Sequence, residues 1–129
     1  MEPGGDARGV SRVASGRPGR YLTPLRIIQS PLAKRDVRGY YTHIGFRDKD
    51  AAERFLKGVN RTFACLAEQP DIGSTRLWLN PALQEIRAWP VVGFDQFIVY
   101  YRRRSADSLW IARILRGSVP PKGVLRTPD

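Results

Sequence analysis

The pattern of apolar and polar positions divides the chain into one strand, two helices and three further strands. The second helix has the clearest pattern, because its apolar residues recur every three or four positions and so form one stripe. These residues are Ala52, Phe55, Leu56, Val59, Phe63 and Leu66. Asp48 is a good N-cap for this helix and Pro70 ends it. The pattern therefore predicts a helix over residues 49–69.

A short apolar run, LRIIQ, and a weaker helical pattern come before that helix. The run ends at Ser30-Pro31, a pair that favours a helix start because the hydroxyl caps free N–H groups and the proline ring fixes φ. Apolar residues then follow at helical spacing, and Gly45 is expected to break the helix. The sequence thus predicts a strand over 24–29 and a helix over 31–44.

Three strand-like runs follow near the C-terminus, rich in β-branched and aromatic residues and bounded by Gly, Asp and Ser. Such runs are typical of an antiparallel meander. They predict strands over 84–91, 96–103 and 108–116, with turns at Gly93–Asp95 and Ser105–Ser108. The order of elements predicts an α+β fold, in which a helical hairpin packs on one face of a small, mostly antiparallel sheet.

Side chains alternate between the two faces of the middle strand of this meander. Phe97, Val99 and Tyr101 share one face, and their neighbours share the other. The alternation does not determine which face lies under the helices. The triple arginine 102–104 is expected at the hairpin that follows. Trp78 lies in a predicted loop, where a local packing role is favoured over an exposed anchor for a partner.

The charge balance favours anionic partners. The chain of 129 residues has the length of one domain and a net charge of +10, from 22 basic and 12 acidic residues. Such a balance suits nucleic acid or an acidic protein. One histidine, His43, and one cysteine, Cys65, supply neither a disulfide nor a metal site, so no metal and no cofactor are expected.

The two ends of the chain differ in composition from the middle. Residues 1–20 are rich in Gly, Arg and Ser, and we expect a disordered tail because so few large apolar residues are available for burial. The domain is expected to span residues 21–119, and residues 120–129 to be irregular. No apolar run approaches transmembrane length and no secretory signal is evident, so the cytoplasm is the expected location.

Four segments together resemble the RelE/ParE superfamily of toxins from bacterial toxin–antitoxin modules. They are SPLAKRDV after the first strand, AAERFLKGVNRTFACLAEQPDIG with its Pro-x-x-Gly turn, EIRAWPVVGFDQFIVYYR, and LWIARILRGS. The resemblance covers roughly residues 22–119 and is closer to the ParE branch, the plasmid stabilisation proteins, than to the ribonuclease branch.

The resemblance to the ParE branch implies a toxin that poisons DNA gyrase by binding it. Such a toxin hydrolyses nothing itself and is neutralised by a cognate antitoxin encoded nearby, in some cases within a higher-order toxin–antitoxin assembly. Family antitoxins place a helix in an apolar groove of the toxin. The candidates for lining that groove are Tyr41, Trp89 and Trp110, and those for contacting the target are Arg87 and the pair Arg113 and Arg116.

Two alternatives remain open at the level of sequence. A RelE-type mRNA endonuclease would use Arg87, Arg113 and Arg116 to stabilise charge on the phosphate. However, Gln96-Phe97 stands where that branch carries a basic residue, and no Tyr or His follows Arg116. A degenerate family member that binds its antitoxin without being toxic is the other alternative.

Overall fold

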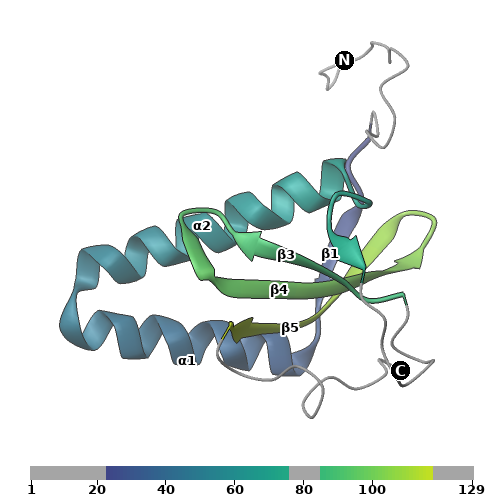
Figure 1. Ribbon diagram of the computed structural model, residues 1–129. Coiled ribbons are helices and arrows are strands. Elements are labelled where there is room, and N and C mark those ends of the chain that lie inside the picture. Colours follow the sequence, from purple (N-terminus) through teal and green to yellow (C-terminus); the bar gives the residue numbers. More distant parts are fainter. Residues whose placement is uncertain (1–22, 76–84, 118–129) are drawn as a thin grey trace.

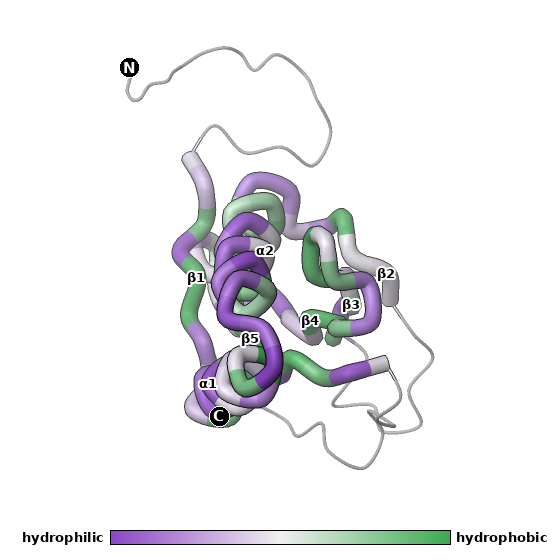
Figure 2. The backbone as a smooth tube through the Cα atoms, turned by 90° about the vertical axis from the view of Figure 1, so that its left-hand side faces the viewer, coloured by the Kyte–Doolittle hydropathy of each residue, from purple (hydrophilic) through white to green (hydrophobic). Residues whose placement is uncertain are grey.

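The computed structural model describes residues 23–75 and 85–117 (Figure 1). These residues form a five-stranded sheet with two helices packed on one of its faces, as Figures 1 and 2 show. The elements are β1 (Arg26–Gln29), α1 (Pro31–Arg47), α2 (Lys49–Glu68), β2 (Ser74–Thr75), β3 (Arg87–Val91), β4 (Phe94–Ser105) and β5 (Ser108–Arg116). The predicted α+β fold with a helical hairpin on a small sheet is confirmed.

The strand order of the sheet is β1-β5-β4-β3-β2. β1 and β5 are parallel, and each of the other neighbouring pairs is antiparallel. The first and the last strand of the described chain are therefore neighbours. The meander of β3, β4 and β5 forms the middle of the sheet, as its turn residues predicted.

α1 begins where the sequence predicted, but it ends later. The Ser30 hydroxyl accepts the N–H of Ala33 at 2.9 Å, which confirms the predicted cap. The predicted break at Gly45 was wrong. Gly45 lies inside the helix and close to α2, because an added Cβ would be 3.4 Å from the Cβ of Ala52, which is contact distance. The chain leaves the helix only at Asp48, whose carboxylate accepts the N–H of Ala51 at 3.1 Å and caps α2.

The strands also differ from the prediction at their ends. β4 continues through the triple arginine 102–104, which the sequence had placed at the hairpin, because the ladder with β5 extends to the pair Ser105 and Ser108. The turn itself is Ala106–Asp107. The short strand β2 was not predicted, and it pairs only with the first two residues of β3.

The main core lies between the sheet and the helices. Phe97, Val99 and Tyr101 are the β4 residues that face the helices, which decides the question that the alternation left open. The ring of Phe55 from α2 contacts that of Phe97 with centroids 4.9 Å apart. Tyr40 from α1 packs edge-on against the same Phe97 ring at 4.7 Å. Both helices therefore meet over the middle strand.

The opposite face of the sheet carries a second, smaller apolar cluster. Its buried members are Ile86, Ala88, Tyr100, Ala112 and Leu115. Trp110 and Ile98 pack against it and are half-buried. The sheet is thus apolar on both faces, which explains why its strands contain almost continuous apolar runs in place of a strict alternation.

Several sequence predictions fall outside the described residues, namely Trp78, the tail over residues 1–20 and residues 120–129. Of the described ones, His43 is exposed on α1 and Cys65 is half-buried on α2. Neither helix of the described chain has the combination of length and apolarity that crossing a membrane requires.

Candidate functional site

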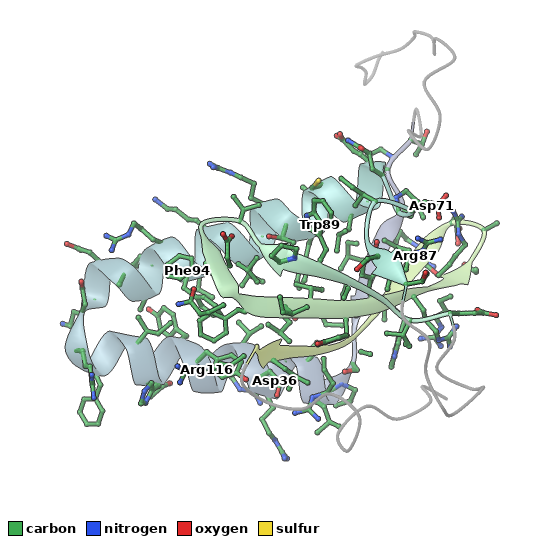
Figure 3. The ribbon with its side chains drawn as sticks, viewed as in Figure 1. Asp36, Asp71, Arg87, Trp89, Phe94 and Arg116 are labelled. Atoms are coloured by element: carbon green, nitrogen blue, oxygen red, sulfur yellow. The ribbon has the colours of Figure 1, made fainter. Side chains whose placement is uncertain are left out.

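The three arginines that the sequence singled out do not form one site. Arg87 belongs to β3, whereas Arg113 and Arg116 belong to β5, and β4 runs between these strands. Figure 3 shows Arg87 and Arg116 at different ends of the sheet. The surroundings of the three side chains also differ.

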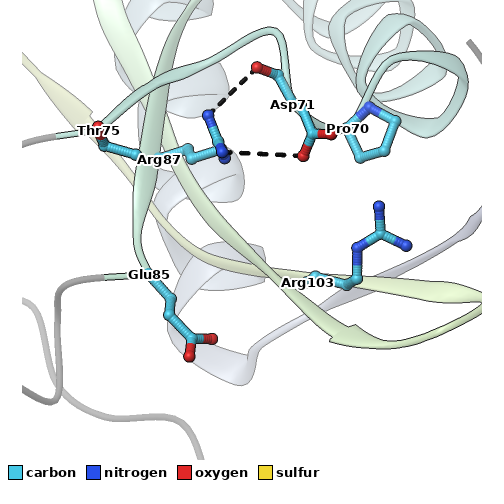
Figure 4. Close-up of a pocket in the computed structure, with 6 residues that line it drawn as sticks. All are labelled: Pro70, Asp71, Thr75, Glu85, Arg87 and Arg103. Carbon is cyan, nitrogen blue, oxygen red and sulfur yellow. Dashed lines mark hydrogen bonds and ion pairs between the residues drawn. The ribbon is translucent and has the colours of Figure 1, made fainter. Parts of the chain in front are cut away.

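Arg87 holds the turn that follows α2. Its Nη1 donates to the carbonyl oxygen of Gly73 at 2.8 Å and to that of Asp71 at 3.2 Å. Its Nη2 lies 3.8 Å from the Asp71 carboxylate, as the dashed lines of Figure 4 indicate. The guanidinium therefore uses several of its five N–H donors to bind one short turn.

Tyr101 of β4 also holds this turn. Its hydroxyl donates to the carbonyl oxygen of Pro70 at 2.8 Å and accepts the N–H of Gly73 at 2.9 Å. Burial raises the pKa of Tyr101 to about 12, although the bond from Gly73 acts in the opposite direction. Arg87 and Tyr101 together explain the Pro-x-x-Gly turn of the sequence, because its polar backbone groups are satisfied by these two side chains.

A cavity of about 300 Å³ opens beside this turn (Figure 4). It is lined by Pro70, Asp71, Thr75, Glu85, Arg87 and Arg103. Two guanidinium groups and two carboxylates face it, so its walls are close to electrically neutral. Such a lining gives no preference for an anion over a cation.

Arg113 forms a two-pronged ion pair with Asp36 of α1. Its Nε lies 2.8 Å from Asp36 Oδ2 and its Nη2 2.9 Å from Oδ1. The backbone N–H of Ile114 donates to Oδ2 as well, at 3.0 Å. Only 17% of the Arg113 side chain and 10% of the Asp36 side chain are exposed. The hydrogen bond to Asp36 raises the pKa of Arg113, which keeps the guanidinium charged.

Arg116 has different surroundings, because it is exposed at the end of β5 opposite Phe97. Within the described part of the chain its side chain has neither a hydrogen bond nor an ion pair. Of the three candidates, Arg116 is therefore the one whose guanidinium is available to an external anion.

The three candidates for an antitoxin groove lie in three separate places. The hydroxyl of Tyr41 donates to Glu53 Oε2 at 2.8 Å on the helical side, and this bond raises the pKa of Tyr41. Trp89 packs against the core under the helices, and Trp110 packs on the opposite face of the sheet. The guanidinium of Arg104 covers the Trp110 ring at 4.9 Å. A single groove does not contain all three.

Sequence reasoning missed Asp36, and it missed the hydrogen bonds by which Ser30 and Tyr101 join distant parts of the chain. The Ser30 hydroxyl donates to the carbonyl of Ala112 at 2.7 Å and thereby ties the start of α1 to β5. A signal for Asp36 was present: it is an acidic residue beside Val37 and Tyr40, on the stripe of α1 that faces the core. An acid at such a position requires a buried partner.

The described residues contain no group of three or more His, Cys, Asp or Glu side chains arranged to hold a metal ion.

Comparisons with known proteins agree with this architecture. A search of curated proteins gave no significant match. Among solved structures, the chain is similar to one from a chromosomal ParDE toxin–antitoxin system of P. aeruginosa, with a TM-score of 0.58 and 17% identity, over 71% of this chain and 95% of that chain. The family described as the ParE toxin of the type II toxin–antitoxin system, parDE, matches residues 27–120. The chain therefore belongs to the ParE family of toxins.

Proposed function

We propose that this protein is the toxin of a parDE-type module, that it acts in the cytoplasm by binding DNA gyrase, and that a cognate antitoxin encoded nearby neutralises it. The family match over residues 27–120 is the observation that carries the proposal. The action is proposed to be binding without bond cleavage. The surroundings of the arginines support that part of the proposal.

A ribonuclease of this fold would need donors that converge on one phosphate as its charge develops. Arg87 is engaged by the carbonyls of Asp71 and Gly73, and Arg113 by the carboxylate of Asp36. Arg116 remains exposed at the end of β5. Because the three arginines lie in separate surroundings, their guanidinium groups do not converge on one phosphate. This favours the binding toxin over the endonuclease.

The antitoxin is expected to cover apolar surface that the isolated toxin leaves exposed. The large apolar residues exposed in the described chain are Leu32, Val92 and above all Phe46, which is 91% exposed at the tip of the helical hairpin. Tyr41, Trp89 and Trp110 stay candidates for separate contacts of an antitoxin that wraps around the toxin. A partner that binds only the folded toxin raises its apparent stability.

Induced expression in a bacterial host tests the proposal directly. We expect filamentation and an SOS response, both relieved when the neighbouring antitoxin gene is co-expressed. In vitro, the purified protein should inhibit supercoiling by gyrase and leave mRNA intact, with or without ribosomes. Arrest of translation and defined mRNA cleavage, with supercoiling unaffected, would instead establish the endonuclease.

Arg116→Ala is the most informative variant in these two assays. The side chain is exposed and has neither a hydrogen bond nor an ion pair within the described chain, so its loss should leave folding intact. For a binding toxin the effect on gyrase inhibition should be modest and should decrease at high salt. For a nuclease, the loss of one donor to the transition state lowers the cleavage rate on the order of 10²–10³-fold.

A further inference from the structure

The outer surface of the helical hairpin carries a group of cations that the domain itself does not use. Lys34, Arg35 and Arg38 lie in the first part of α1, and Lys57 and Arg61 in the second part of α2. All five side chains are exposed. Within the described residues none of them has a side-chain hydrogen bond or an ion pair. We call these five residues the basic ridge.

The antiparallel packing of the helices sets these cations level with one another. Tyr41 of α1 is bonded to Glu53 of α2 at 2.8 Å. Arg38 precedes Tyr41 by three residues in α1, and Lys57 follows Glu53 by four residues in α2. Because the two helices run in opposite directions, Arg38 and Lys57 lie at about the same height along the hairpin. One turn further on, Lys34 and Arg61 are level in the same way, on the order of 6 Å along the helix axes. The cations of the two helices thus lie at matching heights along the hairpin, in two successive pairs.

The acidic residues of the helices do not neutralise the basic ridge. Asp36 points to β5 and is engaged by Arg113 and Ile114. Glu53, four positions before Lys57, accepts the Tyr41 hydroxyl. The remaining acids lie at the helix ends, namely Asp48, Asp50 and Glu68. Within the described part of the chain, the positive charge of the basic ridge is therefore not balanced by a hydrogen-bonded or ion-paired acid.

The composition of the ridge distinguishes between two kinds of anionic partner. A protein partner needs a central apolar contact, with charged groups confined to the rim. Most exposed residues beside the ridge cations are small or polar, such as Gly39, Asn60 and Ala64. One large apolar residue near them, Leu32, is exposed at 36%, and the most exposed aromatic residue, Phe46, lies at the far tip of the hairpin. Interfaces with nucleic acid are polar and strongly basic, as this surface is.

We propose that the basic ridge binds the phosphate backbone of double-stranded DNA without sequence preference. In its biological setting this rests on the proposed function, because gyrase is an enzyme that holds DNA. The toxin would then contact the DNA in the gyrase complex as well as the enzyme. Contacts with phosphate supply affinity that is independent of sequence and falls with salt concentration.

Fluorescence anisotropy of the full-length protein with a labelled 25-base-pair duplex of arbitrary sequence measures this binding. The double variant Arg38→Gln/Lys57→Gln removes one ridge cation from each helix. Arg47→Gln/Lys49→Gln is the matched control, because it removes the same charge from the exposed tip of the same hairpin. We expect the slope of log Kobs against log salt to fall by about 2 in the ridge variant, since each phosphate contact contributes about 0.9. The control should keep the slope of the wild type.

Three results would overturn the proposal. The first is an absence of duplex binding at low salt, and the second is an equal loss in both variants, which would indicate net charge alone. The third is displacement of the duplex by poly-glutamate at equal charge concentration, which would assign the ridge to an acidic protein. Thermal melting of both variants verifies that they fold. A wild type that binds the duplex but does not inhibit gyrase would refute the proposed function and leave the ridge in place.

Discussion

The carboxylate of Asp36 in α1 accepts the backbone N–H of Ile114 in β5 at 3.0 Å. β1 pairs with β5 only as far as Ile111, so the last part of β5 has no strand on that side among the described residues. An unpaired edge of this kind is a template for unwanted strand pairing. Asp36 closes it with a side chain, and α1 thus covers a face of the sheet and protects its edge at once.

Replacement of Asp36 by alanine should therefore destabilise the domain strongly. It leaves Arg113 partly buried without its counter-charge and removes the acceptor of the Ile114 N–H. Loss of one partner from a buried pair costs about 3 kcal/mol or more. Urea unfolding measures the effect, and Asp95→Ala, at an exposed site, is the control with an expected change within about 0.5 kcal/mol. A loss of under about 1 kcal/mol in Asp36→Ala would contradict the assigned role.

Tyr101→Phe tests the network at the turn after α2. The variant removes the hydroxyl that serves the carbonyl of Pro70 and the N–H of Gly73 while keeping the ring. Unsatisfied buried polar groups cost about 1–3 kcal/mol. We expect a loss in this range by urea unfolding.

The same variant should change the dependence of stability on pH. The pKa of Tyr101 is raised from 10.0 to about 12 by burial. Between these values the unfolded chain has lost the proton that the folded chain still holds, so stability falls as pH rises through this range. Two pKa units correspond to about 3 kcal/mol. Wild type should therefore lose more stability than Tyr101→Phe between pH 9 and pH 11.5, and parallel curves would disprove this.

The sequence predicted most of the fold because its elements are marked locally. The Ser30-Pro31 start of α1, the apolar stripe of α2 and the glycine turn before β4 are each set by neighbouring residues. The continuation of α1 past Gly45 was not predictable in this way. Gly45 lies inside α1 and close to Ala52 of the other helix, and tertiary surroundings of this kind override a weak local preference for ending the helix.

The site was harder to predict than the fold, because the role of an arginine depends on residues far away in the chain. Arg113 and Asp36 are 77 positions apart, and although Asp36 lies on the core-facing stripe of α1, nothing in the sequence identifies Arg113 as its partner. Arg87 likewise depends on a turn that precedes it by 14 to 16 positions. The sequence identified charged residues on strands, whereas only the tertiary structure separates those that hold the fold from Arg116, which is exposed.

Two glycines on the helices should respond to alanine in opposite ways. At Gly39, in the middle of α1, an added Cβ meets nothing within 4 Å. Alanine should stabilise the domain there by about 0.5–1 kcal/mol through its higher helix propensity. At Gly58, an added Cβ would lie 2.5 Å from the carbonyl oxygen of Val92, which is backbone and cannot yield easily. Here overpacking should outweigh the propensity and lower the thermal midpoint. A rise in both midpoints would refute the close approach of α2 to the turn before β4.

Arg87→Ala and Arg116→Ala should separate stability from function. The first removes the hydrogen bonds to the carbonyls of Asp71 and Gly73, so we expect a lower thermal midpoint. The second removes an exposed side chain and should change the midpoint little. A midpoint that is unchanged in Arg87→Ala would show that the turn holds without it and would return Arg87 to the target-binding candidates.

The parallel pairing of β1 with β5 also has a consequence for folding during synthesis on the ribosome. The Ser30 hydroxyl donates a hydrogen bond to the carbonyl of Ala112, 82 positions later in the chain. Among the described residues, β1 has no strand partner until β5 has been made. Contacts between such distant positions form last and slowly. A growing chain therefore has no complete sheet until β5 has been synthesised. For a protein of a toxin family, this ordering delays the native surface until the last described strand is available.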